Sequence, residues 1–336
     1  MFTDASFMIQ TAPLESFQGR QAIRRGPWPC SILGTGMALP PRTVDNEALI
    51  RDLKLDTTAD WISTRTGIQE RRFLDDGDDL VELACEAALQ ALESSGTTPD
   101  EITLVVVATS TNPNLMPSVA SLVQAALLAE NAVAFDINVA CSGFVHAFDV
   151  AFRWLQTTGG KALVIGADQG SRLFSPTDRS TAVFFGDAAG AVVIGTDGSG
   201  EVLASELHSR GDATPLRVPT DGHMTMDGKA IWNFATQFLP QTVRSLCAKA
   251  GVTVDQIQLL VPHQANLNIL KASAEELGLP LDRVAVTVNR LGNTVAASIP
   301  TALHSALHER MAVSGDLVAL VGFGAGLAWG GQLIRL

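Results

Sequence analysis

Apolar runs alternate with segments of helical periodicity along most of the chain. Continuous runs rich in Val and Ile occur at 102–110 and 161–168, and a helical stretch precedes each of them. Such runs are typical of strands that are buried on both faces in an α/β protein. The run at 181–196 predicts two further strands separated by a turn of Gly and Ala. The pattern as a whole predicts an α/β fold.

Three segments of the first half of the chain are echoed, in the same order, in the second half. "ESSGTTPDEITLVVVA" (93–108) matches "AKAGVTVDQIQLLVPH" (248–263), "AVAFDIN" matches "RVAVTVN", and "GGKALVIGA" matches "SGDLVALVGF". A general similarity among α/β segments is the alternative explanation for any one echo. Three in the same order indicate a duplicated α/β unit with a pseudo-twofold relation.

We expect an N-terminal extension at 1–29, a first α/β half at 30–200 and a second half at 201–336. The extension lacks the apolar core of a signal peptide, and no apolar run of about 18 residues is free of charges. We therefore expect a cytoplasmic protein that does not span a membrane. The 336 residues are 46% hydrophobic, which is enough for a well-buried core.

Charge and cysteine spacing narrow the classes of function. A net charge of −12 disfavours nucleic acid and anionic membranes as partners. The cysteines are scattered without a Cys-x-x-Cys pair, so we expect neither a disulfide framework nor a zinc site. His304 and His308 lie four residues apart, but no third ligand is evident, and we expect them on a solvated helix face.

Three chemically useful side chains fall at or just after predicted strands. Cys141 follows "AFDINVA", His263 follows "IQLLVP", and Asn293 follows "VAVTVNRLG". Ligands bind at the carboxyl ends of strands in open α/β sheets. A duplicated unit would bring these equivalent strand ends to one centre.

Each of these side chains also has a purely structural explanation. A free cysteine such as Cys141 often fills a core, although a helix N-terminus would favour its thiolate as a nucleophile. A lone histidine such as His263 is often structural, and Asn293 suits a helix N-cap. The glycine-rich stretch at 321–331 lacks the ending of a phosphate loop and would instead expose backbone N–H groups to an oxyanion. The residues alone leave these alternatives open.

Six motifs between residues 30 and 336 resemble those of the β-ketoacyl-acyl carrier protein synthase III family of the thiolase superfamily. The matching pieces, in order, are "DWISTRTGIQERR", "ACSGF", "SPTDRSTAVFFGDAAGA", "VPHQAN", "GNTVAAS" and "GFGAGLAWG". The resemblance implies a thiolase-like α/β/α/β/α five-layer fold in a homodimer. It also implies a condensing acyltransferase that uses coenzyme A thioesters as substrates and needs no cofactor or metal.

The resemblance implies a role for each candidate. Cys141 would take an acyl group from acyl-CoA, with the amides of Cys141 and Ala325 as the oxyanion hole. His263 and Asn293 would bind the carbonyl of a malonyl thioester and stabilise the enolate that forms when CO2 leaves. The enolate would then attack the acyl-Cys141 carbonyl and release a 3-oxoacyl thioester.

The donor site can be carried over residue by residue from the same motifs. Trp61 and Arg65 resemble the pair that holds the nucleotide end of coenzyme A, and Arg179 resembles a second arginine there. Asn266 and Gly228 resemble residues along the pantetheine arm.

Departures from the family pattern concern the carrier protein and the acyl pocket. Asn268 replaces a family arginine, and Glu275 and Glu276 replace lysines that often follow on that helix. An acidic acyl carrier protein would be repelled rather than attracted there, so its docking is in doubt. Met116 stands where a bulky phenylalanine often closes the partner subunit's acyl tunnel, which suggests a longer or unusual acyl group.

Three readings of the function remain at this stage. The first is decarboxylative condensation in fatty acid or specialised polyketide biosynthesis. The second is an acyltransferase that passes the Cys141-bound acyl group to an alcohol, an amine or another non-malonyl acceptor. The third is a catalytically silent partner subunit, which the presence of all three candidate side chains disfavours.

Overall fold

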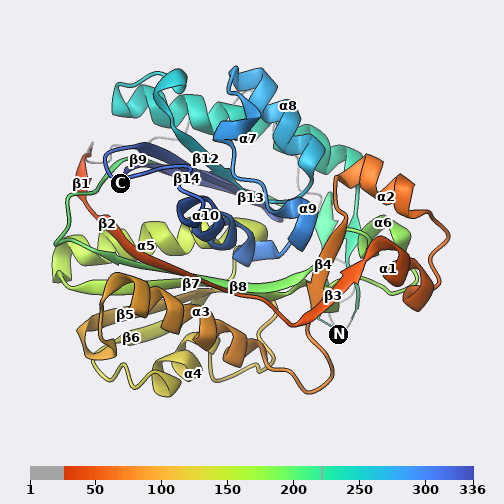
Figure 1. The fold of residues 1–336 in the computed structure, drawn as a ribbon, viewed down its shortest axis with the longest axis horizontal. Coiled ribbons are helices and arrows are strands. Elements are labelled where there is room, and N and C mark those ends of the chain that lie inside the picture. Colours follow the sequence, from red (N-terminus) through yellow and green to blue (C-terminus); the bar gives the residue numbers. More distant parts are fainter. Residues whose placement is uncertain (1–25, 221) are drawn as a thin grey trace, which may run out of the picture.

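The computed structural model describes residues 26–220 and 222–336, so the predicted extension at 1–29 lies outside the described residues as far as residue 25. The described chain forms two five-stranded sheets in a stack of five layers that alternates helices and sheets (Figure 1). Among its helices, none is long and apolar enough to cross a membrane.

The first sheet is built from residues before 200. Its strands, in spatial order, are β2 (Ser31–Ala38), β8 (Asp187–Gly195), β7 (Lys161–Gln169), β5 (Ile102–Ala108) and β6 (Val133–Ile137). β2, β8 and β7 are antiparallel neighbours, whereas β7, β5 and β6 run parallel. The runs at 102–110 and 161–168 are therefore confirmed as central strands, since they form β5 and β7.

The strands of the second sheet are β1 (Trp28–Pro29), β9 (Glu201–Asp212), β14 (Gly326–Arg335), β13 (Leu317–Gly324) and β12 (Leu259–Pro262). From β9 onward the second sheet repeats the order of the first, and β1 is an additional strand at its edge. β12 and β13 are parallel, and a parallel bridge from Leu260 to Val284 continues the sheet in the position that β6 holds in the first one. Each echoed segment thus takes an equivalent place, which confirms the duplicated thiolase-like architecture.

Helices form the other three layers. The outer helices are α3 (Leu80–Ser95) and α4 (Val119–Ala126) on the first sheet, and α7 (Gly228–Ala250) and α8 (Leu267–Leu277) on the second. The central pair, α5 (Gly143–Thr158) and α10 (Ser298–His308), contacts strands of both sheets (Figure 1). The smaller elements gather near one end of the stack, and they are α1 (Asn46–Leu53), α2 (Ala59–Thr66), α6 (Arg179–Ala182), α9 (Val288–Leu291), β3 (Arg42–Asp45), β4 (Glu70–Phe73), β10 (Leu216–Arg217) and β11 (Thr225–Met226).

The first echo has a local physical cause. α3 and α7 both end at a glycine in the left-handed region, Gly96 at φ 63° and Gly251 at φ 71°, where a side chain would be strained. Two residues later, Thr98 and Thr253 open equivalent capping boxes that lead into β5 and β12. The same short sequence signals therefore set the same helix-to-strand connection twice.

The prediction of two strands at 181–196 is wrong. Only β8 is a strand there, while the segment before it completes α6 and a turn. The small residues of this run serve close packing instead of a turn. A Cβ on Gly190 would lie 2.8 Å from the backbone nitrogen of Thr301 in α10, so this position lets the central helix approach the sheet.

The expected solvated helix face at His304 and His308 is only half correct. α10 lies in the central layer, and the His304 ring is partly buried, with its Nδ1 3.0 Å from Thr35 Oγ1. His308, one turn later, is exposed. The described residues contain no cluster of three or more His, Cys, Asp or Glu suited to a metal ion.

Candidate active site

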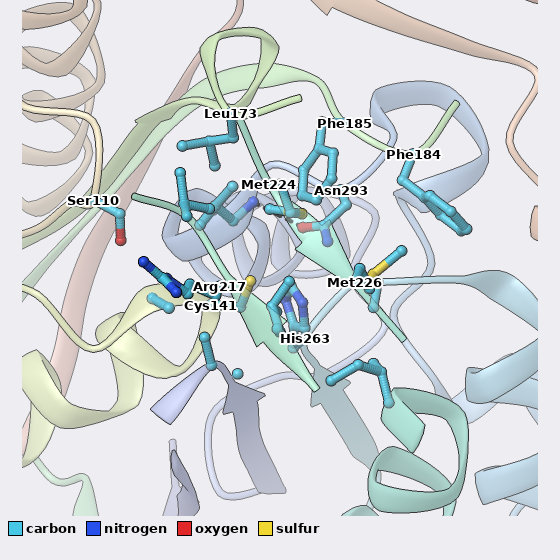
Figure 2. A pocket seen from close by; sticks show the side chains of 18 of the residues that line it. Ser110, Cys141, Leu173, Phe184, Phe185, Arg217, Met224, Met226, His263 and Asn293 are labelled. Atoms are coloured by element: carbon cyan, nitrogen blue, oxygen red, sulfur yellow. Dashed lines mark hydrogen bonds between the residues drawn. The ribbon is translucent and has the colours of Figure 1, made fainter. Parts of the chain in front are cut away.

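One cavity of about 680 Å³ receives the three side chains that sequence analysis singled out. Figure 2 shows Cys141, His263 and Asn293 facing this cavity from separate loops. All three are buried, with exposed fractions of 7%, 1% and 7%. The pseudo-twofold relation explains the convergence, because Cys141 follows β6 in one half and Asn293 follows the equivalent segment in the other.

Cys141 lies in a short 3-10 helix, Ala140–Ser142, that leads directly into α5. Ala140 has φ 45°, an unfavourable conformation for a side-chain-bearing residue that turns the chain sharply before the thiol. Burial raises the pKa of the Cys141 thiol to about 12, and the negative charge of Asp168 adds to the rise, while hydrogen bonds from the Cys141 amide and the Asn293 side chain oppose it. In the empty cavity the group is therefore a neutral thiol at pH 7.

His263 follows β12, and its backbone N–H donates to the Val321 carbonyl of β13 at 2.8 Å. Its Nδ1 lies 2.6 Å from Ser298 Oγ, which leaves Nε2 as the free ring nitrogen. The Phe323 ring packs edge-on against the imidazole, with 5.0 Å between ring centroids. Burial lowers the pKa of His263 to about 3, so the imidazole is neutral at pH 7.

Hydrogen bonds to neighbouring backbone groups hold both the main chain and the side chain of Asn293. Its N–H donates to the Phe184 carbonyl at 2.8 Å, and its Oδ1 accepts from the Val295 N–H at 2.9 Å. The side-chain oxygen is thus occupied, and the amide Nδ2 is the group left to donate into the cavity. The N-cap expectation is met only by this local turn, because α10 begins five residues later.

Asp168, at the end of β7, connects the loops behind the cavity. Its Oδ1 accepts from the Ser110 N–H and the Thr111 hydroxyl, each at 2.8 Å, and its Oδ2 accepts from the Ala296 N–H at 3.0 Å. Burial raises the pKa of Asp168 to about 6, although these hydrogen bonds act in the opposite direction. One carboxyl group therefore ties the loop after β5 to the loop that carries Asn293.

The glycine-rich stretch forms a hairpin rather than an open loop. β13 ends at Gly324 and β14 begins at Gly326, with only Ala325 between them. A Cβ on Gly324 would lie 2.9 Å from the Cys141 backbone nitrogen, so the hairpin end packs directly against the nucleophile's turn. Ala325 also lines the cavity, as an oxyanion-hole residue must.

The predicted donor residues divide into two groups. Gly228 and Asn266 line the cavity, whereas Trp61, Arg65 and Arg179 are not among its lining residues. The Arg179 guanidinium lies over the Trp61 ring, 5.4 Å from its centroid. Trp61 is 38% exposed, so this pair forms a surface platform rather than part of the cavity wall.

Among the predicted binding residues, Asn266 has a structural role and Met116 lies away from the cavity of its own chain. Asn266 caps α8 by accepting from the Asn268 N–H at 2.8 Å, and its own Nδ2 donates to the Arg65 carbonyl at 3.1 Å. Met116 is 78% exposed and does not line the cavity of its own chain, so its predicted place in a partner's acyl tunnel stays a prediction.

The altered docking positions lie on and beside α8. Asn268 Nδ2 donates to the Thr64 and Arg65 carbonyls, which ties α8 to the end of α2. Glu276 pairs with Arg244 at 3.0 Å, and Glu275 is exposed and forms no ion pair with another described residue.

Sequence reasoning missed four residues with a part in this geometry. Asp168 and Ser298 stand at the ends of quoted motifs, and an acid that ends an apolar strand was a usable signal. Arg172 and Arg217 also line the cavity, and nothing in the local pattern distinguishes them from surface arginines.

Two family models match the chain. The model of 3-oxoacyl-[acyl-carrier-protein (ACP)] synthase III matches residues 135–211, and the model of its C terminal matches residues 247–336. A β-ketoacyl-[acyl-carrier-protein] synthase III of Rhizorhabdus wittichii is 43% identical over 317 residues, covering 90% of this chain and 98% of that protein. Its counterpart in Rhodobacter capsulatus is 43% identical over 319 residues, with coverage of 90% and 98%.

Solved structures give the same result. The crystal structure of 3-oxoacyl-[acyl-carrier-protein] synthase III from Aquifex aeolicus has a TM-score of 0.88 and 39% identity, and covers 91% of this chain and 100% of that one. The priming β-ketosynthase of the R1128 polyketide pathway has a TM-score of 0.85 and 32% identity, with coverage of 94% and 99%.

Proposed function

The chain belongs to the 3-oxoacyl-[acyl-carrier-protein] synthase III family, and from this premise we propose how its cavity works. The protein is an acyl-transferring condensing enzyme of fatty acid or polyketide synthesis. The observation that supports our assignment of roles is the meeting of Cys141, His263 and Asn293 in one buried cavity.

The first half-reaction is transfer of an acyl group from coenzyme A to Cys141. The sulfur of Cys141 attacks the thioester carbonyl, its bond to that carbon forms, and the carbon–sulfur bond to coenzyme A breaks. The proton of Cys141 leaves with coenzyme A as its thiol, so no net charge is created in the cavity. The amides of Cys141 and Ala325 stabilise the oxyanion, and one such donor is typically worth about 3–4 kcal/mol.

The second half-reaction forms the new carbon–carbon bond. The neutral His263 Nε2–H and the Asn293 Nδ2 donate hydrogen bonds to the carbonyl oxygen of a malonyl thioester. The carbon–carbon bond to the carboxylate breaks, CO2 leaves, and the bonding electron pair stays behind as the enolate that these donors hold. The enolate carbon attacks the acyl-Cys141 carbonyl, the carbon–sulfur bond to Cys141 breaks, the 3-oxoacyl thioester leaves, and the Cys141 thiolate takes a proton from solvent. A neutral imidazole suits this step, because an imidazolium would protonate the carbanion. Covalent storage on sulfur divides one difficult step into two.

The partners follow from this assignment. Acyl-CoA and a malonyl thioester are the substrates, with Trp61, Arg65 and Arg179 at the nucleotide end, and no further cofactor takes part. The enzyme works as a homodimer, in which Met116 reaches the partner's acyl pocket. An ordinary acidic acyl carrier protein docks poorly, because Glu275 and Glu276 present negative charge where the family often has lysines.

Intact-protein mass spectrometry with a panel of acyl-CoAs tests the first half-reaction. We expect an adduct on the wild-type chain that maps to Cys141 and is absent from Cys141→Ala. If no donor labels the wild-type protein, the proposal fails.

Release of CO2 from malonyl-CoA tests the second half-reaction separately. Cys141→Ala should retain decarboxylation, whereas His263→Ala and Asn293→Ala should each lose it by about a hundredfold or more. Condensation by Cys141→Ala at the wild-type rate would contradict the mechanism.

A further inference from the structure

The cavity has a positive lining inside an acidic protein. The chain carries 35 acidic and 23 basic residues, yet the described lining residues include two arginines, Arg172 and Arg217, and no Asp or Glu. Both side chains are exposed, and within residues 26–220 and 222–336 neither guanidinium forms a hydrogen bond or ion pair with the protein. Exposed guanidiniums that line a mostly apolar space are accessible to an anionic group of a bound ligand.

The anionic groups of the proposed substrates do not account for these arginines. The phosphates of coenzyme A belong at Trp61, Arg65 and Arg179, which lie outside the cavity lining. The malonyl carboxylate must leave as CO2, and a guanidinium paired with it would stabilise the ground state and slow its loss. Arginines in this cavity therefore suit a carboxylate that survives the reaction.

Their position points to the acyl group rather than the pantetheine arm. Arg217 ends β10, and Arg172 ends a short 3-10 helix, Gly170–Arg172, after β7. Figure 2 shows Arg217 and Ser110 on the same side of the cavity as Cys141, while Met226 and Phe184 lie on the other side. β11, which carries Met226, leads into α7, where the predicted pantetheine residue Gly228 lies.

The wall on the Arg217 side is also polar enough for a charged group. Ser110, Asn112 and Asn138 line it, and the Ser110 hydroxyl donates to Asn138 Oδ1 at 2.9 Å. Leu173 and Leu216, the chain neighbours of the two arginines, supply apolar surface for a short methylene chain. This part of the lining therefore offers apolar side chains for a methylene chain and guanidinium groups for its charged end.

We propose that the acyl group transferred to Cys141 ends in a carboxylate, so that the donor is the coenzyme A monothioester of a short dicarboxylic acid, recognised by Arg217 and Arg172. This inference rests on the proposed function, since it specifies the substrate class of the same site. The carboxylate takes no part in bond making. It orients the acyl chain while the thioester carbon passes from coenzyme A to Cys141.

Matched donors provide the test. Succinyl-CoA is compared with butyryl-CoA, and glutaryl-CoA with pentanoyl-CoA, so that each pair has the same number of acyl carbons and differs in the terminal carboxylate. The rate of adduct formation on Cys141, measured by intact-protein mass spectrometry, gives one ratio for each pair. We expect wild-type ratios above one, and ratios at least tenfold lower in Arg217→Gln and in Arg172→Gln.

Two further variants sharpen the result. Arg217→Lys keeps the charge but loses the two-pronged geometry, and it should give an intermediate ratio. Arg51→Gln removes an exposed arginine of α1 that does not line the cavity, and it should leave the ratio unchanged. Because each ratio compares two donors on one variant, a general loss of folding or reactivity cancels.

The outcomes separate this inference from the function beneath it. If butyryl-CoA and pentanoyl-CoA label Cys141 as fast as their carboxylated counterparts, or if Arg217→Gln leaves the ratio unchanged, the dicarboxylic proposal is wrong and the condensing function stands. If neither class of donor labels Cys141, the proposed function itself fails.

Discussion

Cys141 and His263 are both buried in one cavity, and burial favours the neutral form of each. Burial raises the pKa of the thiol to about 12 and lowers the pKa of the imidazole to about 3. Both shifts oppose an ion pair between the two groups, of the kind that activates many cysteine nucleophiles. The nucleophile has to form as the acyl donor binds, when the thiol proton can pass to the departing coenzyme A.

Burial is the largest cause of the raised pKa of Cys141, and the negative charge of Asp168 is the second largest. Asp168→Asn removes that negative charge and should lower the thiol pKa, so alkylation by iodoacetamide at pH 8 should become several-fold faster. The measurement is the rate of Cys141 alkylation against pH, followed by mass spectrometry. Asp187→Asn is the control, because it removes a second buried carboxylate that is not among the groups shifting the thiol.

A merely structural role for Asp168 predicts a different result. Loss of its bonds to Ser110 and Ala296 would loosen the loops and alter the melting temperature without moving the pH profile. An unchanged or higher thiol pKa in Asp168→Asn would therefore count against the electrostatic role.

We expect Ser298 to determine which nitrogen of His263 carries the proton. When the Ser298 hydroxyl donates to Nδ1 across their 2.6 Å contact, Nε2 holds the proton and can donate to a substrate carbonyl. Ser298→Ala removes this preference, so malonyl-CoA decarboxylation should fall by about ten- to a hundredfold. Nitrogen-15 NMR of the histidine ring reports the tautomer directly. A wild-type Nε2–H signal that persists unchanged in Ser298→Ala would contradict this assignment.

At the scale of elements, the hairpin of β13 and β14 carries Ala325, whose amide we propose as part of the oxyanion hole. A Cβ on Gly324 would approach within 2.9 Å of the Cys141 nitrogen and 3.0 Å of the Ser142 nitrogen. Gly324→Ala should therefore displace the hairpin end from Cys141 and slow its acylation by about ten- to a hundredfold. Single-turnover acylation measures the effect. Gly211→Ala in β9 is the matched control, because a Cβ there meets nothing within 4 Å. Equal acylation rates in the two variants would show that the Gly324 contact is irrelevant.

The sequence was most informative where local signals repeat. The capping glycines Gly96 and Gly251 and the apolar runs of β5 and β12 set equivalent connections in both halves, so the duplicated fold could be predicted from pattern. The prediction of a turn within residues 181–196 was wrong, because small residues that let a helix pack close to a strand resemble the small residues of a turn. Only the three-dimensional contact between Gly190 and Thr301 distinguishes the two.

The candidate site shows the same division. Cys141 and His263 could be found because each follows a strand, β6 and β12. The strand predicted before Asn293 is wrong, since only a bridge at Val284 and the short helix α9 precede it. Arg217 could not be found in this way, because it ends a strand of two residues and lines the cavity only in the folded chain. The burial that neutralises Cys141 and His263 also depends on packing of the two halves, which no local pattern records.

At the scale of the whole molecule, the duplicated fold brings different side chains from its two halves into one cavity. The first half supplies the thiol of Cys141, and the second supplies the donors His263 and Asn293. α5 and α10 lie between the sheets and contact both, so movement of one half against the other would change the spacing of these groups. The central helix layer therefore fixes the spacing of the groups to which we assign acyl storage and enolate formation.

The charge of α8 concerns the outer surface of the molecule. Glu275 and Glu276 add to a net charge of −12, although Glu276 is paired with Arg244. On our proposal, an acidic carrier protein meets repulsion both locally and over the whole surface. The double variant Glu275→Lys/Glu276→Lys reverses the local part and leaves the α2–α8 bonds of Asn268 in place. It should raise kcat/KM for a malonyl-carrier protein about tenfold relative to malonyl-CoA.

Salt and a charge-matched control distinguish local docking from net charge. The gain should fall as ionic strength rises from 0.05 to about 0.5 M, because exposed charges are screened. Glu86→Lys/Glu93→Lys makes the same net change of charge on α3, an outer helix on the other side of the stack. It should leave the preference between malonyl-carrier protein and malonyl-CoA within about twofold of wild type.

If the α3 variant gains as much as the α8 variant, the effect belongs to net charge and not to a docking face. If the wild-type enzyme already prefers an ordinary acidic carrier protein, then Glu275 and Glu276 do not impair docking, because their repulsion is overcome by contacts elsewhere on that surface.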